Sequence, residues 1–158
     1  MSATTLTTRH HIRVHLNSRF ARGKLARMSY RAQGPFDVQA TPFPPYDTSD
    51  GVTLGRMTFV KQFRGDLEAT SSVEMLAART PIPNSAGYVA LERIVGSLHG
   101  KRGSFVVQHT ATMTRGQPSL VISVIPDSGT GELSGLSGTM KIDNSDGKHD
   151  YDFEYSLG

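Results

Sequence analysis

Apolar and polar residues alternate strictly over the last ten positions of the chain. The odd positions carry His149, Tyr151, Phe153, Tyr155 and Leu157, whereas the even positions carry Asp150, Asp152 and Glu154. Successive side chains of a β-strand point to opposite faces, so a period of two predicts a strand with one buried and one solvated face.

The same period recurs in seven more segments, separated by short runs rich in glycine, proline and aspartate. No segment follows the helical period of 3.6 residues. About eight short strands at close spacing predict an antiparallel sandwich or barrel. We expect these strands at residues 30–41, 54–63, 65–75, 87–98, 104–113, 119–125, 139–142 and 149–157.

The connections between these segments contain turn-forming residues. Loops or turns are expected at residues 77–85, 100–103, 115–118 and 129–138, and Gly135 and Gly138 are interpreted as turn or bulge glycines. Asp146 and Gly147 predict a type I′ hairpin, because that turn needs two residues with positive φ.

Three charged or ionisable residues lie on otherwise apolar faces of the predicted strands. By parity these are Lys61 between Phe59 and Phe63, Glu92 between Ala90 and Ile94, and His109 between Val107 and Ala111. Tyr88 shares the face of Glu92. We therefore predict a polar group inside the barrel or sandwich.

Residues 87–98 are apolar on both faces, so parity alone does not decide which face lies inside. Val89, Leu91 and Val95 make its second face equally apolar. If that face lies outside, it predicts an interface, because large exposed apolar patches usually mark one.

The length and composition of the chain indicate a single domain and exclude several kinds of functional site. A chain of 158 residues is long enough for one domain with a substantial core. It has no cysteine, which excludes disulfides, thiolate nucleophiles and cysteine-ligated metal sites and fits a cytoplasmic location. No apolar run approaches the roughly 20 residues of a membrane-spanning helix, so no membrane span is expected.

The positive charge is concentrated at the start of the chain. Six of the 17 lysines and arginines lie in residues 1–27, which contain no acid, so the other 11 face 14 acidic residues. We interpret residues 1–27 as a disordered basic extension and residues 28–158 as the barrel domain. The extension also has the composition of a transit peptide or a nucleic-acid-binding arm. The body of the chain is acidic, and no nucleic-acid partner is expected.

Four segments carry a resemblance to a known family. They are residues 65–71 (GDLEATS), 85–90 (SAGYVA), 103–109 (GSFVVQH) and 126–133 (PDSGTGEL). In this order and spacing they resemble the bacterial DUF3224 family, which is similar to the allene oxide cyclase barrel group. The resemblance covers residues 28–158 and implies an eight-stranded antiparallel barrel with a central cavity. It implies no activity, since a shared fold does not transfer function.

The inward polar residues suggest two kinds of chemistry. A buried glutamate has a raised pKa unless a cation lies close, so Glu92 could act as an acid or base with His109 as its partner. Lys61 would pair with Glu92 or lose its proton and become a nucleophile. Alternatively, the three residues form a structural network.

We therefore expect a barrel that binds a small apolar molecule, with Glu92, His109 and Tyr88 as polar anchors. The expected ligand-binding side chains are Phe59, Phe63, Tyr88, Phe105, Met113, Tyr151, Phe153 and Tyr155. The alternatives are a cofactor-independent isomerase or cyclase, with Glu92, His109 and Lys61 as candidate catalytic residues, and a non-catalytic module that forms a homo-oligomer.

No cofactor or metal is expected. The glycines at 129 and 131 lack the lysine and helix of a phosphate-binding loop. His109, His149 and Glu92 contain the right donor atoms for a metal, but their spacing does not require one.

Overall fold

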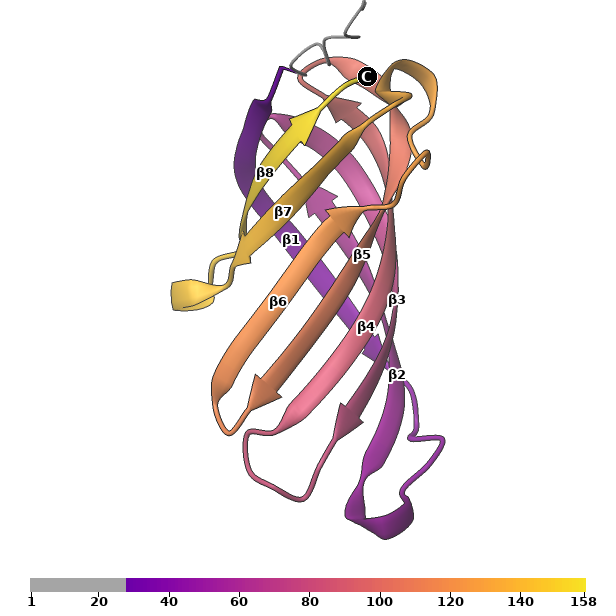
Figure 1. Ribbon diagram of the computed structural model, residues 1–158, viewed down its shortest axis with the longest axis vertical. Helices are drawn as coiled ribbons and strands as arrows, with labels where there is room; N and C mark the ends of the chain where they lie inside the picture. Colours follow the sequence, from indigo (N-terminus) through magenta and orange to yellow (C-terminus); the bar gives the residue numbers. More distant parts are fainter. Residues whose placement is uncertain (1–27) are drawn as a thin grey trace, which may run out of the picture.

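The chain forms a closed antiparallel β-barrel of eight strands arranged in chain order (Figure 1). The computed structural model describes residues 28–158, and the basic extension expected over residues 1–27 lies outside them. The expected all-β barrel is confirmed. Its strands are β1 (Tyr30–Pro42), β2 (Thr53–Phe63), β3 (Leu67–Arg79), β4 (Ala86–Leu98), β5 (Lys101–Thr114), β6 (Gln117–Val124), β7 (Ser137–Asp143) and β8 (Asp150–Ser156).

The strands differ in length, and this difference divides the barrel into two halves. β3, β4 and β5 have 13 or 14 residues, whereas β7 and β8 have 7 each. Figure 1 shows the β7–β8 hairpin across the upper half, with β2 to β6 continuing below it. β6 and β7 meet only through the pairs Ile122–Met140 and Ser123–Thr139. The barrel is therefore completed in its upper half.

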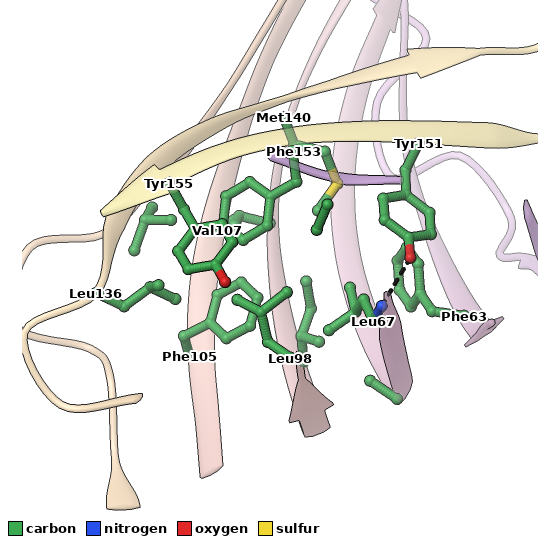
Figure 2. Close-up of a cluster of buried hydrophobic side chains, with 14 of the residues drawn as sticks. Phe63, Leu67, Leu98, Phe105, Val107, Leu136, Met140, Tyr151, Phe153 and Tyr155 are labelled. Atoms are coloured by element: carbon green, nitrogen blue, oxygen red, sulfur yellow. Dashed lines mark hydrogen bonds between the residues drawn. The ribbon is translucent and has the colours of Figure 1, made fainter. Parts of the chain in front are cut away.

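Aromatic and aliphatic side chains fill the upper half (Figure 2). Phe105 and Phe153 are fully buried and stack with ring centroids 5.6 Å apart. The Tyr151 hydroxyl accepts a 2.8 Å hydrogen bond from the Leu67 amide and donates a 2.9 Å bond to the Arg64 carbonyl. These bonds satisfy polar groups that would otherwise be buried unpaired.

The predicted Asp146–Gly147 turn is confirmed. Both residues have positive φ (57° and 72°), and the Lys148 amide donates to the Ser145 carbonyl. They lie in the short 3₁₀ turn Ser145–Gly147. The other 3₁₀ turns are Ser49–Gly51 and Gly131–Leu133.

Several predicted connections were too long. The turn expected at residues 100–103 consists of His99 and Gly100, and the one at 115–118 consists of Arg115 and Gly116. His99 and Arg115 have positive φ, and neither His-Gly nor Arg-Gly is among the residue pairs that predict a type I′ turn.

The ends of two other loops also differ from the prediction. β3 continues to Arg79, into the loop expected at 77–85, and β7 begins at Ser137, inside the turn region expected at 129–138. Gly135 is a turn glycine with φ 77°, as predicted. Gly138 instead lies in β7, where a Cβ atom would collide with the Glu154 carbonyl oxygen.

The parity of β4 follows the prediction made from Glu92. Ala90, Glu92 and Ile94 are buried, while the intervening residues face outward. In residues 28–158, no helical segment has the length and apolarity of a membrane span.

Candidate functional site

Four adjacent strands bring polar side chains together where the filled half of the barrel meets the cavity below it. Lys61 comes from β2, Ser71 from β3, Glu92 from β4 and His109 from β5. Lys61 pairs directly with Ser71, whereas His109 pairs with Ala90, two residues from Glu92. Ser71 and His109 are therefore diagonal neighbours of Glu92 on the adjacent strands, whereas Lys61 reaches Glu92 from β2, two strands away.

The Glu92 carboxylate is the centre of this cluster. Its Oε2 atom accepts hydrogen bonds from Lys61 Nζ and His109 Nε2, both at 2.8 Å, and Oε1 accepts from Ser71 Oγ at 2.6 Å. Glu92 is completely buried, and its three partners are also buried. A buried carboxylate of this kind is stable only with such partners.

The pKa of Glu92 lies below its ordinary value. Burial alone would raise this pKa, but hydrogen bonds from His109, Lys61 and Ser71 and the charge of Lys61 together lower it. Glu92 is therefore an ionised acceptor at neutral pH. A raised pKa is expected for a buried glutamate only when no cation lies close, and here Lys61 is that cation. An ionised Glu92 has no proton to donate, so it is unsuitable as a general acid.

Lys61 balances the charge of Glu92. Its ammonium nitrogen lies 5.2 Å from the ring centroid of Phe36 and 5.7 Å from that of Phe63, within cation–π range. An ammonium group has three donors, and one of them is used by Glu92. Lys61 therefore retains donors beyond the ion pair.

Glu92 also fixes the orientation of His109. Because an ionised carboxylate only accepts hydrogen bonds, Nε2 of His109 must carry a proton. Within residues 28–158, no buried side-chain nitrogen or oxygen lacks a hydrogen-bond partner, and no described group bonds to Nδ1 of His109. Nδ1 is therefore accessible.

The accessible sides of Lys61 and His109 face a cavity of about 240 Å³. It lies below the filled half, and the β7–β8 hairpin contributes Asn144 and His149 to its rim. Most of its wall is apolar. The remaining lining residues are Phe36, Val38, Phe59, Val73, Met75, Tyr88, Ala90 and Ile142.

Comparison with known proteins identifies the family to which this chain belongs. The family described as protein of unknown function (DUF3224) matches residues 32–155. The chain belongs to the DUF3224 family. A DUF3224 protein of unknown function from Shewanella oneidensis MR-1, known from a crystal structure, has 49% sequence identity and a TM-score of 0.79. The similarity covers 83% of this chain and 98% of that one. The sequence matches none of the curated proteins with which it was compared.

The cluster lies within the part of the chain that matches the DUF3224 family. Lys61, Ser71, Glu92 and His109 all lie between residues 32 and 155. The three residues selected by strand parity are thus brought together. Ser71 was not selected, although it lies on the apolar face of β3 between Ala69 and Val73, and the same parity rule would have found it.

The expected ligand-binding residues of the DUF3224 chain fall into two groups. Phe59 and Tyr88 line the cavity, and Met113 lines a neighbouring pocket of about 400 Å³ at the open end of the barrel. The other five are not among the residues that line the cavity, because they pack into the filled upper half. These are Phe63, Phe105, Tyr151, Phe153 and Tyr155.

Tyr88 connects the two pockets and remains protonated. Burial raises its pKa, and the nearby negative charge of Glu92 raises it further. Its hydroxyl is thus available as a hydrogen-bond donor. Tyr88, Met75 and Asn144 line both pockets, which are therefore adjacent.

The structure gives no support to a metal site at the cluster. Among residues 28–158 no three histidine, aspartate or glutamate side chains are grouped so that they could hold a metal ion. His149, considered above as a ligand, packs its ring 5.2 Å from that of Phe36.

Proposed function

We propose that this DUF3224 protein binds a small, predominantly apolar molecule in the cavity beside Lys61 and His109. The observation that carries this proposal is an apolar cavity of about 240 Å³ with an ionic cluster at one side. Ligand sites commonly combine apolar walls with a few convergent polar groups. Phe59, Val73 and Met75 would contact the apolar part, and Lys61, His109 and Tyr88 the polar part.

The dimensions favour a ligand smaller than a typical drug, since pockets for such molecules measure roughly 300–1,000 Å³. The adjacent pocket of about 400 Å³ extends from Tyr88 to Met113 and Leu120. A longer apolar tail would lie there, along the inner faces of β4, β5 and β6. The tail would cover the side chains of Met113 and Leu120, which line this pocket and are exposed in the structure.

The eight-stranded architecture supports the resemblance to the allene oxide cyclase barrel group. Fold analogy alone does not identify a substrate, so the proposal rests on the cavity and its polar side. We place this binding function in the cytoplasm, because the absence of cysteine fits a reducing compartment.

Native mass spectrometry and a titration test this function together. The purified protein is examined for a retained molecule and then titrated with heptan-2-one, with chemical shifts of the cavity residues monitored by NMR. A ligand of this size should bind with a dissociation constant between about 1 μM and 1 mM. The absence of both a retained molecule and any shift would refute the proposal.

A pair of variants on one strand shows whether the cavity itself is occupied. Ala90 is buried in the cavity wall, and its neighbour Val89 faces outward. Ala90→Leu should weaken heptan-2-one binding about tenfold or more by filling the space. Val89→Leu should leave binding unchanged. Equal effects of the two substitutions would indicate a site other than the cavity.

The outer face of β4 favours a second candidate function, self-association. Val89, Leu91 and Val95 are each about half exposed, and the exposed Leu76 of β3 pairs with Val89. Leu76, Val89 and Leu91 form an apolar patch, bounded by Glu74 and Arg93, that suits a second copy of the chain. Sedimentation velocity should then give an oligomer that Leu91→Glu dissociates, and a wild-type monomer at micromolar concentration would exclude this function.

A further inference from the structure

We propose that Lys61 and His109 bind a carbonyl group of the ligand and exchange a proton at the carbon next to it. This inference rests on the proposed ligand-binding function and assigns it a substrate class, uncharged enolisable ketones. In this account Lys61 stabilises the carbonyl oxygen, His109 acts as the base, and Glu92 positions both.

A donor and an acceptor come from two side chains that bond to the same carboxylate oxygen and line the same cavity. Lys61 Nζ and His109 Nε2 are each 2.8 Å from the same oxygen of Glu92, so they lie no more than two hydrogen-bond lengths apart. Both side chains line the cavity. Lys61 offers an N–H donor, and in the neutral form of His109, whose single proton is on Nε2, Nδ1 offers a lone pair. A carbonyl oxygen and an adjacent C–H group match this arrangement.

Charge balance favours an uncharged ligand. The Lys61 ammonium and the Glu92 carboxylate form an ion pair, so their charges compensate each other. A bound carboxylate would add an uncompensated negative charge beside Glu92, which is completely buried. A ketone introduces no charge until its oxygen becomes negative during the reaction, where the Lys61 ammonium stabilises it most strongly.

The proposed step is a reversible enolisation. The proton on the carbon next to the carbonyl moves to Nδ1 of His109, and the C–H electron pair forms a carbon–carbon double bond. The carbonyl π pair moves onto the oxygen, which accepts a hydrogen bond from Lys61. Reversal returns a proton from Nδ1 to carbon. The imidazolium formed in between keeps its bond to Glu92, which stabilises its charge as a carboxylate does beside a catalytic histidine.

Deuterium exchange tests this step with a defined probe. Heptan-2-one is incubated with the full-length protein in D₂O, and loss of its C–H signals next to the carbonyl is followed by ¹H NMR. We expect faster exchange than in buffer alone. Sodium heptanoate, which carries a charge in the same place, should bind about tenfold more weakly or worse.

Two variants on β5 separate the role of His109 from a structural effect. His109→Gln retains an N–H group for Glu92 but lacks the basic nitrogen, so the exchange rate measured at saturating heptan-2-one should fall by about 100-fold or more. Thr110→Gln introduces the same residue at the exposed neighbouring position and should exchange at the wild-type rate. Circular dichroism confirms that each variant is folded.

The results distinguish this inference from the binding function. If heptan-2-one binds without faster exchange, or His109→Gln exchanges as fast as wild type, the proton-transfer inference is wrong and ligand binding stands. Tighter binding of heptanoate than of heptan-2-one would overturn the assignment of an uncharged ligand. If neither probe binds and no molecule is retained, both proposals fail.

Discussion

The ammonium group of Lys61 lies 2.8 Å from the Glu92 carboxylate, and the two side chains are only 8% and 0% exposed. Desolvation of two charges is costly, and their attraction compensates only while both partners are present. The pair therefore makes the barrel sensitive to the loss of either residue, and it holds charge beside the cavity where a ligand would meet it.

Lys61→Met should destabilise the barrel strongly. It leaves Glu92 buried without its cation, and we expect a loss of about 3–5 kcal/mol in the free energy of unfolding, measured by urea denaturation. The double variant Lys61→Met, Glu92→Met should be more stable than the single variant. The matched control is Arg56→Met at the exposed Arg56–Glu74 pair, which should cost about 1 kcal/mol or less. Similar losses at both pairs would contradict this account.

Stability should depend on pH through Glu92. Its folded-state pKa lies below its ordinary value of 4.5, so the unfolded chain takes up a proton at higher pH than the folded one. The stabilisation is complete above 4.5 and is lost as pH falls toward the folded-state pKa. Wild type should therefore lose more free energy of unfolding between pH 6 and pH 3 than Glu92→Gln does. Other carboxylates titrate in both proteins, so the difference between the two curves is the relevant quantity.

The sequence predicted the cluster because three of its members are conspicuous. Lys61, Glu92 and His109 are charged or ionisable residues among apolar neighbours at a spacing of two, and such residues are rarely buried without a partner. Strand parity also places Ser71 on the inward face of β3, but an uncharged serine fits either face of a strand and does not by itself call for a buried partner. Its hydrogen bond to Glu92 became evident only when β3 and β4 were paired.

The division between core and cavity could not be predicted from strand parity. Phe59 and Phe63 lie on the same face of β2, yet Phe59 lines the cavity and Phe63 is buried in the filled half. Their environments differ because β7 and β8 are short and complete the barrel only in its upper half. That closure depends on the pairing of β8 with β1, between residues more than a hundred positions apart.

The hydroxyl of Tyr151 should contribute measurably to the stability of the filled half. Tyr151→Phe keeps the ring packed 5.5 Å from Phe63 but leaves the Leu67 amide without its partner. An unsatisfied buried donor costs about 1–3 kcal/mol, which chemical denaturation would detect. Tyr30→Phe provides the control. Tyr30 is exposed, so removal of its hydroxyl group should change the free energy of unfolding by about 0.5 kcal/mol or less. A fully stable Tyr151→Phe would mean that the Leu67 amide finds another partner.

The β5–β6 turn offers a stabilising substitution. Arg115 adopts φ 50° at the first position of a two-residue turn, a conformation that asparagine tolerates better than arginine. Arg115→Asn should therefore raise the free energy of unfolding by about 0.5–1 kcal/mol, seen as a higher denaturation midpoint.

His99→Asn is the informative comparison, because His99 has nearly the same backbone conformation in the β4–β5 turn. There the substitution also removes a 2.6 Å hydrogen bond between His99 Nδ1 and the Tyr155 hydroxyl. Loss of that bond offsets the gain in backbone energy, since a hydrogen bond contributes about 0.5–1.5 kcal/mol. We thus expect Arg115→Asn to stabilise the protein and His99→Asn to be neutral or destabilising. Equal stabilisation by both would show that the His99–Tyr155 bond makes no net contribution.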